Sequence, residues 1–216
     1  MGRIHRYKGK HILVEFEAER CIHTGDCVRS LPEVFNTQRK GRWVHPDAAD
    51  AQRIAEVCAR CPTGALRARS LDDGRLLDQP PEHNSIQIVT NGPLYIHARM
   101  RINGEEPPAY RVALCRCGSS SAMPFCDGSH RQLTFEDSGQ PVALPMPGEA
   151  AKGELDIQSQ QPGPLRVVGP FLLIDGAGKA RGHYRQLAFC CCGSSRMKPL
   201  CDGSHALIGE SSAKLL

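Results

Sequence analysis

Short apolar runs, separated by turn residues, recur throughout this chain of 216 residues. In the first third they lie at 10–17, 41–44 and 65–67, and they contain β-branched, aromatic or alternating apolar residues. Runs of this length and composition predict strands. We therefore expect short strands in the N-terminal part of the chain.

A helical pattern lies between the second and third of these runs. Four residues recur at helical spacing: Ile54, Val57, Cys58 and Cys61. Asp47 is placed to cap the start of this helix, and the Pro-Thr-Gly sequence at 62–64 is expected to end it. Residues 1–78 thus combine a helix with short strands, which predicts a small α+β domain.

Two similar series of apolar runs follow, and both predict strand-rich units. The runs lie at 85–89, 95–97, 99–102 and 110–114 in the first series, and at 166–168, 171–174 and 186–189 in the second. We delimit the two units as residues 84–133 and 161–210. Residues 134–160 between them are rich in Pro, Gly, Gln and Glu, so we expect a surface linker there.

Each series of runs ends in a cysteine-rich segment that occurs twice. Residues 115–130 return as residues 190–205, with a constant offset of 75 (190 − 115 = 75 and 205 − 130 = 75). Three cysteines and one histidine occupy equal places in the two copies: Cys115, Cys117, Cys126 and His130, then Cys190, Cys192, Cys201 and His205. The chain therefore contains a duplicated unit with potential metal ligands.

The spacing within each copy divides the four ligands into two pairs. Cys115 and Cys117 are separated by one residue, so an extended or turn backbone can direct both sulfurs at one metal. Cys126 and His130 are four residues apart, which places them on one face of a helical turn. Two such pairs suit either one tetrahedral ion or two bridged irons. Three thiolates and one imidazole are also an ordinary ligand set for structural zinc, although the usual zinc spacing differs.

The complete string in both copies is Cys-x-Cys-x2-Ser-x3-Pro-x-Cys-Asp-Gly-Ser-His. It resembles the CDGSH iron–sulfur family at every defined position. The resemblance implies a 2Fe-2S cluster in each copy, with the Cys-x-Cys pair on one iron and the Cys/His pair on the other. It also implies that the two β-rich units pack together as a pseudo-dimer about a pseudo-two-fold axis, so that a monomer suffices.

The N-terminal cysteines form a second, shorter pattern. Cys21, Cys27 and Cys61 resemble the ligands of single-cluster ferredoxins, and more closely those of the divergent ferredoxin-like domain that bacteria fuse to CDGSH units. Ordinary ferredoxins have a cysteine at the middle of the first group, where this chain has Thr24, which cannot replace a thiolate. Three thiolates alone favour a 3Fe-4S cluster.

Two further residues bear on that cluster. Cys58 as a fourth ligand would make a 4Fe-4S site, but it shares a helix face with Ile54 and Val57, and this periodicity favours a place in the core. His23 has no partner at ligand spacing, so we expect it to be solvated. The resemblance thus implies a 3Fe-4S or 4Fe-4S cluster and leaves its type open.

Composition and charge exclude several classes of function. Nine of the 11 cysteines are candidate metal ligands, and thiol and metal chemistry at these spacings predicts a reducing compartment and a cytoplasmic protein. The net charge of +4 arises in residues 1–75, with 14 Lys and Arg against 10 Asp and Glu, and this is too sparse for a nucleic-acid surface. The sequence contains no apolar run of eighteen residues, so we expect no membrane span. A hydrophobic content of 40% with 5% aromatic residues predicts a thin core that depends on its metals.

We therefore expect a soluble one-electron carrier or redox relay that acts on a redox partner protein. The sequence contains no nucleotide loop or nucleophile–base pair, so we expect no enzyme. Two alternatives stay open. The first is a protein of cluster transfer, iron homeostasis or redox sensing, since histidine ligands make a cluster labile in acid and an apo-protein could then accept it. The second is a zinc-stapled interaction module.

The two copies differ beside the proline of the motif. The second copy has Lys198 where the first has Met123. A cation near a cluster favours the more negative, reduced state. We therefore predict the higher reduction potential for the second cluster, provided that the lysine folds back toward it.

Overall fold

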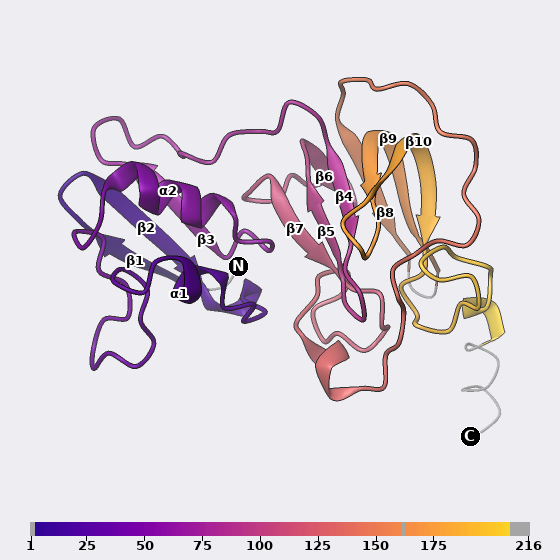
Figure 1. Cartoon of the computed structure of the whole chain (residues 1–216), viewed down its shortest axis with the longest axis horizontal. Coiled ribbons are helices and arrows are strands. Elements are labelled where there is room, and N and C mark those ends of the chain that lie inside the picture. The colour runs from indigo at the N-terminus through magenta and orange to yellow at the C-terminus, as the bar shows by residue number, and fades with distance from the viewer. Residues whose placement is uncertain (1–2, 161–162, 208–216) are drawn as a thin grey trace. The chain divides into compact units, whose positions relative to one another are not determined.

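The computed structural model describes residues 3–160 and 163–207, which belong to two compact units (Figure 1). The N-terminal unit comprises Met1–Gln79 with Pro108–Arg111, and the C-terminal unit comprises Pro80–Pro107 with Val112–Leu216. Helices and strands both occur, so the expected α+β class is confirmed. No helix in the described part of the chain has the length and apolar character needed to span a membrane.

The N-terminal unit contains a three-stranded antiparallel sheet with the order β1-β2-β3. The strands are β1 (Ile4–Lys8), β2 (Ile12–Glu17) and β3 (Leu66–Ser70), and the helices are α1 (Asp26–Ser30) and α2 (Ala51–Ala59). Ile12 and Val14 of β2 point to the core, where Ile54 and Cys58 of α2 pack with them. Alternation along β2 therefore selects one apolar face, as its sequence predicts.

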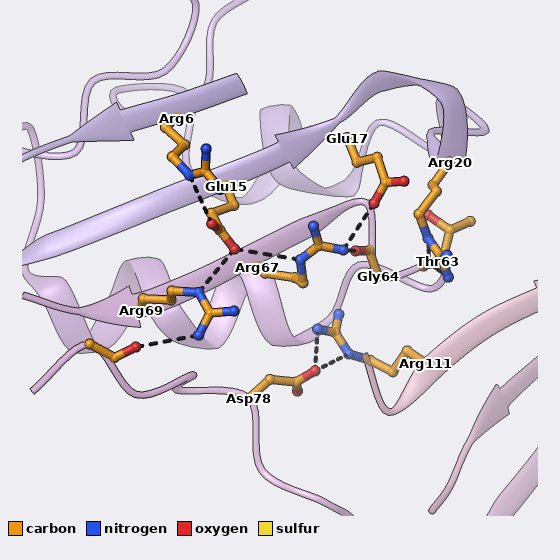
Figure 2. A network of polar contacts seen from close by, with 11 residues as sticks. Arg6, Glu15, Glu17, Arg20, Thr63, Gly64, Arg67, Arg69, Asp78 and Arg111 are labelled. Carbon is orange, nitrogen blue, oxygen red and sulfur yellow. Dashed lines mark hydrogen bonds and ion pairs between the residues drawn. The ribbon is translucent and has the colours of Figure 1, made fainter. Parts of the chain in front are cut away.

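The opposite face of this sheet carries a ladder of charged residues, drawn in Figure 2. Arg6, Glu15 and Arg67 are direct cross-strand neighbours on β1, β2 and β3. The carboxylate of Glu15 lies 3.2 Å from Arg6 and 3.0 Å from Arg69, and the buried guanidinium of Arg67 donates to Glu17 at 3.1 Å. Opposite charges at paired positions thus fix the register of the three strands.

Three expectations for this unit need correction. Residues 41–44 form no strand, because only Val44 pairs, as an isolated bridge to Phe35, while Trp43 packs edge-on against Phe16. Strand β1 was not expected at all. The cap of α2 is Asp50, whose side chain accepts from the backbone N–H of Gln52 at 2.8 Å. Asp47 accepts instead from the backbone N–H of Lys10, in the adjoining loop.

The C-terminal unit contains a seven-stranded sheet in its described residues. Its strands are β4 (Ser85–Ile88), β5 (Leu94–His97), β6 (Met100–Ile102), β7 (Arg111–Leu114), β8 (Leu155–Ser159), β9 (Leu165–Ile174) and β10 (Ala180–Phe189). They follow the order β6-β8-β9-β4-β5-β7, and β10 pairs with β9. The first half of β9 pairs with β8 and its second half with β4, so both series of runs share one sheet.

The pairing registers of the two series repeat with a second constant offset. Ser85 of β4 pairs with His97 of β5, and Asp156 of β8 pairs with Val168 of β9. Both partners are therefore displaced by 71 residues (156 − 85 = 71 and 168 − 97 = 71). The antiparallel pairing of β4 with β5 thus recurs between β8 and β9, with equivalent residues opposite each other.

Two parallel pairings connect one series with the other. Ser85 of β4 pairs with Leu172 of β9, and Asp156 of β8 pairs with Arg101 of β6. These two pairs are also related by 71 residues (156 − 85 = 71 and 172 − 101 = 71). The first strand of each series therefore pairs with a later strand of the other series.

One expectation for this unit is wrong. Residues 134–160 do not form a linker throughout, because Leu155–Ser159 are strand β8 inside the sheet. Leu155 and Ile157 are fully buried. Their alternation with polar residues is a strand pattern, and the Pro- and Gly-rich composition of the preceding residues obscured it. The second strand-rich series therefore begins before residue 161.

The duplicated segments contact each other at two glycines. Cys117 and Cys192 form an isolated antiparallel bridge. Gly118 and Gly193, the residues that follow them, have φ values of +79° and +78°. A Cβ on either glycine would lie 2.7 Å from the carbonyl oxygen of the facing cysteine. Both the positive φ and the backbone approach therefore require glycine.

We expect Gly118→Ala to weaken the junction between the two copies. The left-handed backbone alone costs alanine about 1–2 kcal/mol, and the clash with the carbonyl of Cys192 adds about 1–3 kcal/mol. Gly104→Ala is the matched control, since Gly104 has a φ of +85° and a Cβ added there would meet no atom within 4 Å. Anaerobic urea unfolding measures both losses of stability. Equal losses in the two variants would contradict the close approach.

Candidate metal centres

The Cys-x-Cys pairs of the two copies have almost the same geometry. The two sulfur atoms lie 3.5 Å apart in Cys115 and Cys117, and 3.7 Å apart in Cys190 and Cys192. Each pair directly follows a strand, β7 in the first copy and β10 in the second. The sequence prediction that both sulfurs of a pair face one point therefore agrees with the structure.

Backbone hydrogen bonds connect each Cys-x-Cys pair with the second half of its segment. The N–H of Cys115 donates to the carbonyl of Pro124 at 2.8 Å, and the N–H of Cys126 donates to Ala113 at 2.8 Å. The second copy repeats both bonds, from Cys190 to Pro199 and from Cys201 to Ala188, at 2.9 Å each. The peptide bonds before both prolines are cis. The end of the strand thus holds the later cysteine beside the earlier pair.

The Cys/His pairs also match between the copies. The Nδ1 atom of His130 lies 3.4 Å from the sulfur of Cys126, and that of His205 lies 3.3 Å from the sulfur of Cys201. The backbone N–H of Gly128 donates to the sulfur of Cys126 at 3.4 Å, and Gly203 repeats this bond. In the first copy the turn is a short 3-10 helix, Ser129–Gln132. The expected helical turn therefore brings the pair together in a tighter form.

An aspartate in each motif fixes the turn that carries the histidine. Asp127 accepts from the backbone N–H groups of Ser129 and Ser121 at 3.0 and 2.8 Å, and Asp202 repeats both contacts. Burial would raise the pKa of Asp127, but these hydrogen bonds outweigh it and hold the pKa well below its ordinary value. Its stabilising effect is therefore complete above about pH 3.9 and is lost as the pH falls toward the lower folded pKa.

The protonation of the first copy's ligands depends on their surroundings. A hydrogen bond from Cys117 lowers the pKa of Cys115 to about 6, while the same contact raises that of Cys117. Burial raises the pKa of Cys126 to about 11 and lowers the pKa of His130. Burial thus keeps the imidazole neutral, and a bound cation would supply the charge that deprotonates the remaining thiols.

The residue between the first two cysteines differs in the two copies. The buried guanidinium of Arg116 donates to the carbonyls of Gly92 and Val89 at 2.8 and 2.6 Å, and it forms an ion pair with Asp137. In the second copy, the buried thiol of Cys191 donates to the carbonyl of Gly163 at 2.7 Å. Arg116 therefore anchors its loop to the turn between β4 and β5, and Cys191 anchors its loop to the segment just before β9.

The donor atoms fit a two-iron cluster in each copy. The structure places them as one Cys/Cys pair and one Cys/His pair, which provides two ligands for each iron. Within residues 3–160 and 163–207, no group of three or more His, Cys, Asp or Glu side chains is placed to hold a single metal ion.

The N-terminal cysteines line a cavity of about 660 Å³. Cys21 follows a 3-10 helix, Cys27 lies in α1, and Cys61 lies two residues beyond the end of α2. Much of the remaining lining is apolar, with residues that include Phe16, Ile22, Val28, Trp43, Val57 and Leu66. Burial raises the pKa of Cys27 to about 11, and the neighbouring thiols of Cys61 and Cys21 also raise it.

Arg111 holds the end of α2 that leads into Cys61. Its guanidinium forms a buried ion pair with Asp78 at 2.7 Å. One nitrogen of the same group donates to the carbonyls of Cys58 and Cys61, at 2.7 and 2.6 Å. These carbonyls are among those that a helix end leaves without an intrahelical partner. A buried cation therefore fixes the backbone beside the third cysteine.

Cys58 and His23 lie differently with respect to this cavity. Cys58 is 1% exposed and packs in the core with Ile54 and Val57, as its periodicity favours, and burial raises its pKa well above the ordinary value. His23 is exposed, but its Nδ1 atom lies 3.8 Å from the sulfur of Cys21 and it lines the cavity. The expectation that His23 is solvated is therefore confirmed, whereas the expectation that it has no partner is wrong, because Cys21 lies two residues before it.

Two family models match the chain. The model described as "Divergent 4Fe-4S mono-cluster" matches residues 7–70. The model described as "Iron-binding zinc finger CDGSH type" matches twice, at residues 91–131 and 162–206. The matches cover all the candidate ligands in both units.

Similar proteins occur in Escherichia coli. The protein named "Uncharacterized protein YjdI" from strain K12 is 41% identical over 63 residues, which are 29% of this chain and 82% of the relative. The protein of the same name from strain O157:H7 has the same identity and coverage. No solved structure matches the chain. The chain belongs to the CDGSH iron–sulfur family and carries a divergent 4Fe-4S mono-cluster domain before its two CDGSH units.

Proposed function

We propose that this iron–sulfur protein carries electrons one at a time through two 2Fe-2S clusters and a third cluster in its N-terminal domain. The observation that carries the proposal is the repeated ligand geometry, in which both Cys/His pairs lie at 3.3–3.4 Å and both Cys/Cys pairs at 3.5–3.7 Å. A 2Fe-2S cluster exchanges one electron, and a neutral histidine ligand raises its potential above that of all-cysteine clusters.

The ligands proposed for each cluster follow from these pairs. They are Cys115, Cys117, Cys126 and His130 for the first CDGSH cluster, Cys190, Cys192, Cys201 and His205 for the second, and Cys21, Cys27 and Cys61 for the N-terminal cluster. Gly128 and Gly203 each donate a backbone N–H to a ligand sulfur. Such hydrogen bonds favour the more negative, reduced state of a cluster.

We also propose that the two CDGSH units form an internal pseudo-dimer. The matching registers of the parallel strand pairs β4 with β9 and β6 with β8 support this arrangement. So does the reciprocal approach of Gly118 to Cys192 and of Gly193 to Cys117. In this arrangement the first strand of each unit pairs with a strand of the other unit. A unit of this size buries little apolar surface alone, and here the second unit of the same chain covers it.

The partner is proposed to be another redox protein in a reducing, cytoplasmic environment, with no nucleic acid, membrane or catalytic substrate involved. Cluster donation to an apo-protein is the alternative function. It is favoured by the two histidines, which lie only partly buried on surface turns. Only neutral imidazole binds iron, so protonation in mild acid would detach each histidine from the iron that it binds.

Anaerobic titration with dithionite distinguishes an electron carrier from a protein that donates its clusters. We expect reversible uptake of about one electron for each cluster, about three per chain. The oxidised protein should retain its iron when it is mixed with an apo-ferredoxin. Fast, stoichiometric transfer of iron and sulfide to the apo-ferredoxin, without reversible reduction, would instead establish a cluster donor.

The second CDGSH cluster should have the higher potential of the two. The ammonium group of Lys198 donates to the carbonyl of Ser195 at 2.9 Å, so this side chain folds back over its own loop. Near the first cluster, the positive charge of Arg116 is balanced by Asp137. We expect Lys198→Met to lower the potential of the second cluster by on the order of 60 mV, a tenfold change in its one-electron equilibrium.

Met123→Lys is the reciprocal variant and should raise the potential of the first cluster. Protein-film voltammetry or an EPR-monitored redox titration measures both shifts. An unchanged potential in both variants would rule out this electrostatic effect of the lysine.

A further inference from the structure

Arginine side chains bind the carbonyls of the loop that carries Cys61. Two nitrogens of the Arg20 guanidinium donate to the carbonyl of Thr63, at 3.3 and 3.2 Å. The buried guanidinium of Arg67 donates to the next carbonyl, that of Gly64, at 3.3 Å. Figure 2 shows both arginines beside this loop. The backbone that follows the third cysteine of the cavity is therefore held by cationic side chains.

Arg20 connects two of the segments that carry the candidate ligands. It directly precedes Cys21 in the chain, and the carbonyl that it contacts lies two residues after Cys61. The hydroxyl of Thr63 lies 3.6 Å from the sulfur of Cys61, so the contacted residue also touches a ligand. A single side chain therefore holds the Cys21 segment beside the Cys61 loop.

The charge of Arg20 acts on the sulfur of Cys61. Burial lowers the pKa of this half-buried arginine, while Glu17 and the ionised sulfur of Cys61 raise it. Glu17 also forms an ion pair with Arg67 at 3.1 Å, so its carboxylate is shared between two guanidinium groups. An arginine side chain stays protonated in proteins. Its positive charge therefore stabilises negative charge on the Cys61 side of the cavity.

The chemistry of the cavity fits a group that accepts this charge. Three thiols line it, and the thiols of Cys61 and Cys21 raise the pKa of Cys27, so the three sulfurs lie close enough to repel one another as thiolates. Iron held by these sulfurs gains a negative charge each time the cluster is reduced. A cation beside Cys61 favours that reduced state.

We propose that Arg20 is a positioning residue of the N-terminal cluster, which holds the Cys21 and Cys61 segments together and raises the reduction potential of the cluster through its positive charge. This assignment rests on the proposed function, in which the N-terminal domain binds a cluster. It applies equally to a 3Fe-4S and a 4Fe-4S cluster, because both take up one electron and both use the same two cysteines.

The test compares the full-length holoprotein, purified without oxygen, with Arg20→Gln and Arg20→Lys variants. The readouts are the iron content, the rate at which a chelator removes iron, and an EPR-monitored redox titration. EPR separates the N-terminal cluster from the 2Fe-2S clusters, because a 3Fe-4S cluster gives a signal when it is oxidised. The signal of a reduced 4Fe-4S cluster broadens at temperatures where reduced 2Fe-2S clusters stay visible.

The two variants separate the charge of Arg20 from its hydrogen bonds. We expect Arg20→Gln to lower the potential of the N-terminal cluster by about 59 mV, a tenfold change in its one-electron equilibrium. Arg20→Lys keeps the charge, so the same equilibrium should change less than about twofold. Neither variant offers two nitrogens to the carbonyl of Thr63, so a chelator should remove iron from the N-terminal site about tenfold faster in both.

Arg69→Gln is the matched control. Arg69 belongs to the same charged sheet face, and its guanidinium donates to the carbonyl of Gly74 at 3.3 Å, outside the segments that carry the cysteines. This variant should leave the potential and the chelation rate unchanged. An equal shift of potential in Arg69→Gln and Arg20→Gln would overturn the assignment.

Four further results would also overturn it. They are an unchanged potential in Arg20→Gln, the same shift in Arg20→Lys as in Arg20→Gln, wild-type chelation rates in both variants, and loss of the N-terminal iron from both during purification. If Arg20→Gln alone loses this iron while Arg20→Lys keeps it, the charge is required and the assignment stands.

A Cys21→Ser/Cys27→Ser double variant tests the underlying premise separately. If that variant keeps all the iron of the wild type, the N-terminal domain holds no cluster and the proposed function fails there, whatever Arg20 does. If it loses about three or four irons per chain, the premise holds and the Arg20 variants decide the assignment.

Discussion

The burial of sulfur is the constraint on which this protein depends. The ligand cysteines of the first CDGSH unit and those around the N-terminal cavity lie where burial raises the pKa of Cys126 and Cys27. A bound cation would compensate the charge of these two thiols when they ionise, whereas Cys115, with a pKa lowered to about 6, ionises without one. The protein is otherwise modest in apolar content, with only 5% aromatic residues. We therefore expect metal binding to contribute to the folding of this protein.

Polar contacts position the cysteines that metal binding requires. In the C-terminal unit, hydrogen bonds between the strand end and the later half of the motif hold the four ligands of each copy together. In the N-terminal unit, Arg111 binds the carbonyls of Cys58 and Cys61 and so fixes the end of α2. The C-terminal unit thus positions its cysteines with backbone hydrogen bonds, and the N-terminal unit positions Cys61 with the buried guanidinium of Arg111.

The sequence predicted which cysteine and histidine side chains lie close together better than it predicted the framework around them. The spacing within the CDGSH motif determines which side chains lie close together. Cys126 and His130, four residues apart, are separated by 3.4 Å between the sulfur and the Nδ1 atom. Periodicity likewise placed Cys58 in the core. Strand β8 was missed because its alternation is short and follows a Pro-rich segment. The cap was assigned to Asp47 because either aspartate fits the local pattern, and a contact with distant Lys10 decides between them.

His23 shows a different kind of limit. Nothing in its spacing matches a familiar ligand motif, and its approach to Cys21 depends on a left-handed backbone that the sequence does not specify. Sequence therefore identifies the three thiols of the cavity, and the fold adds the imidazole beside them.

The most direct test of the account is the amount of iron and acid-labile sulfide per chain in protein purified without oxygen. Two 2Fe-2S clusters and a third cluster of 3Fe-4S or 4Fe-4S type predict about seven or eight irons and about eight sulfides, in a red-brown protein. A colourless protein that contains stoichiometric zinc and no sulfide would contradict the account, because the same cysteines would then hold single structural ions.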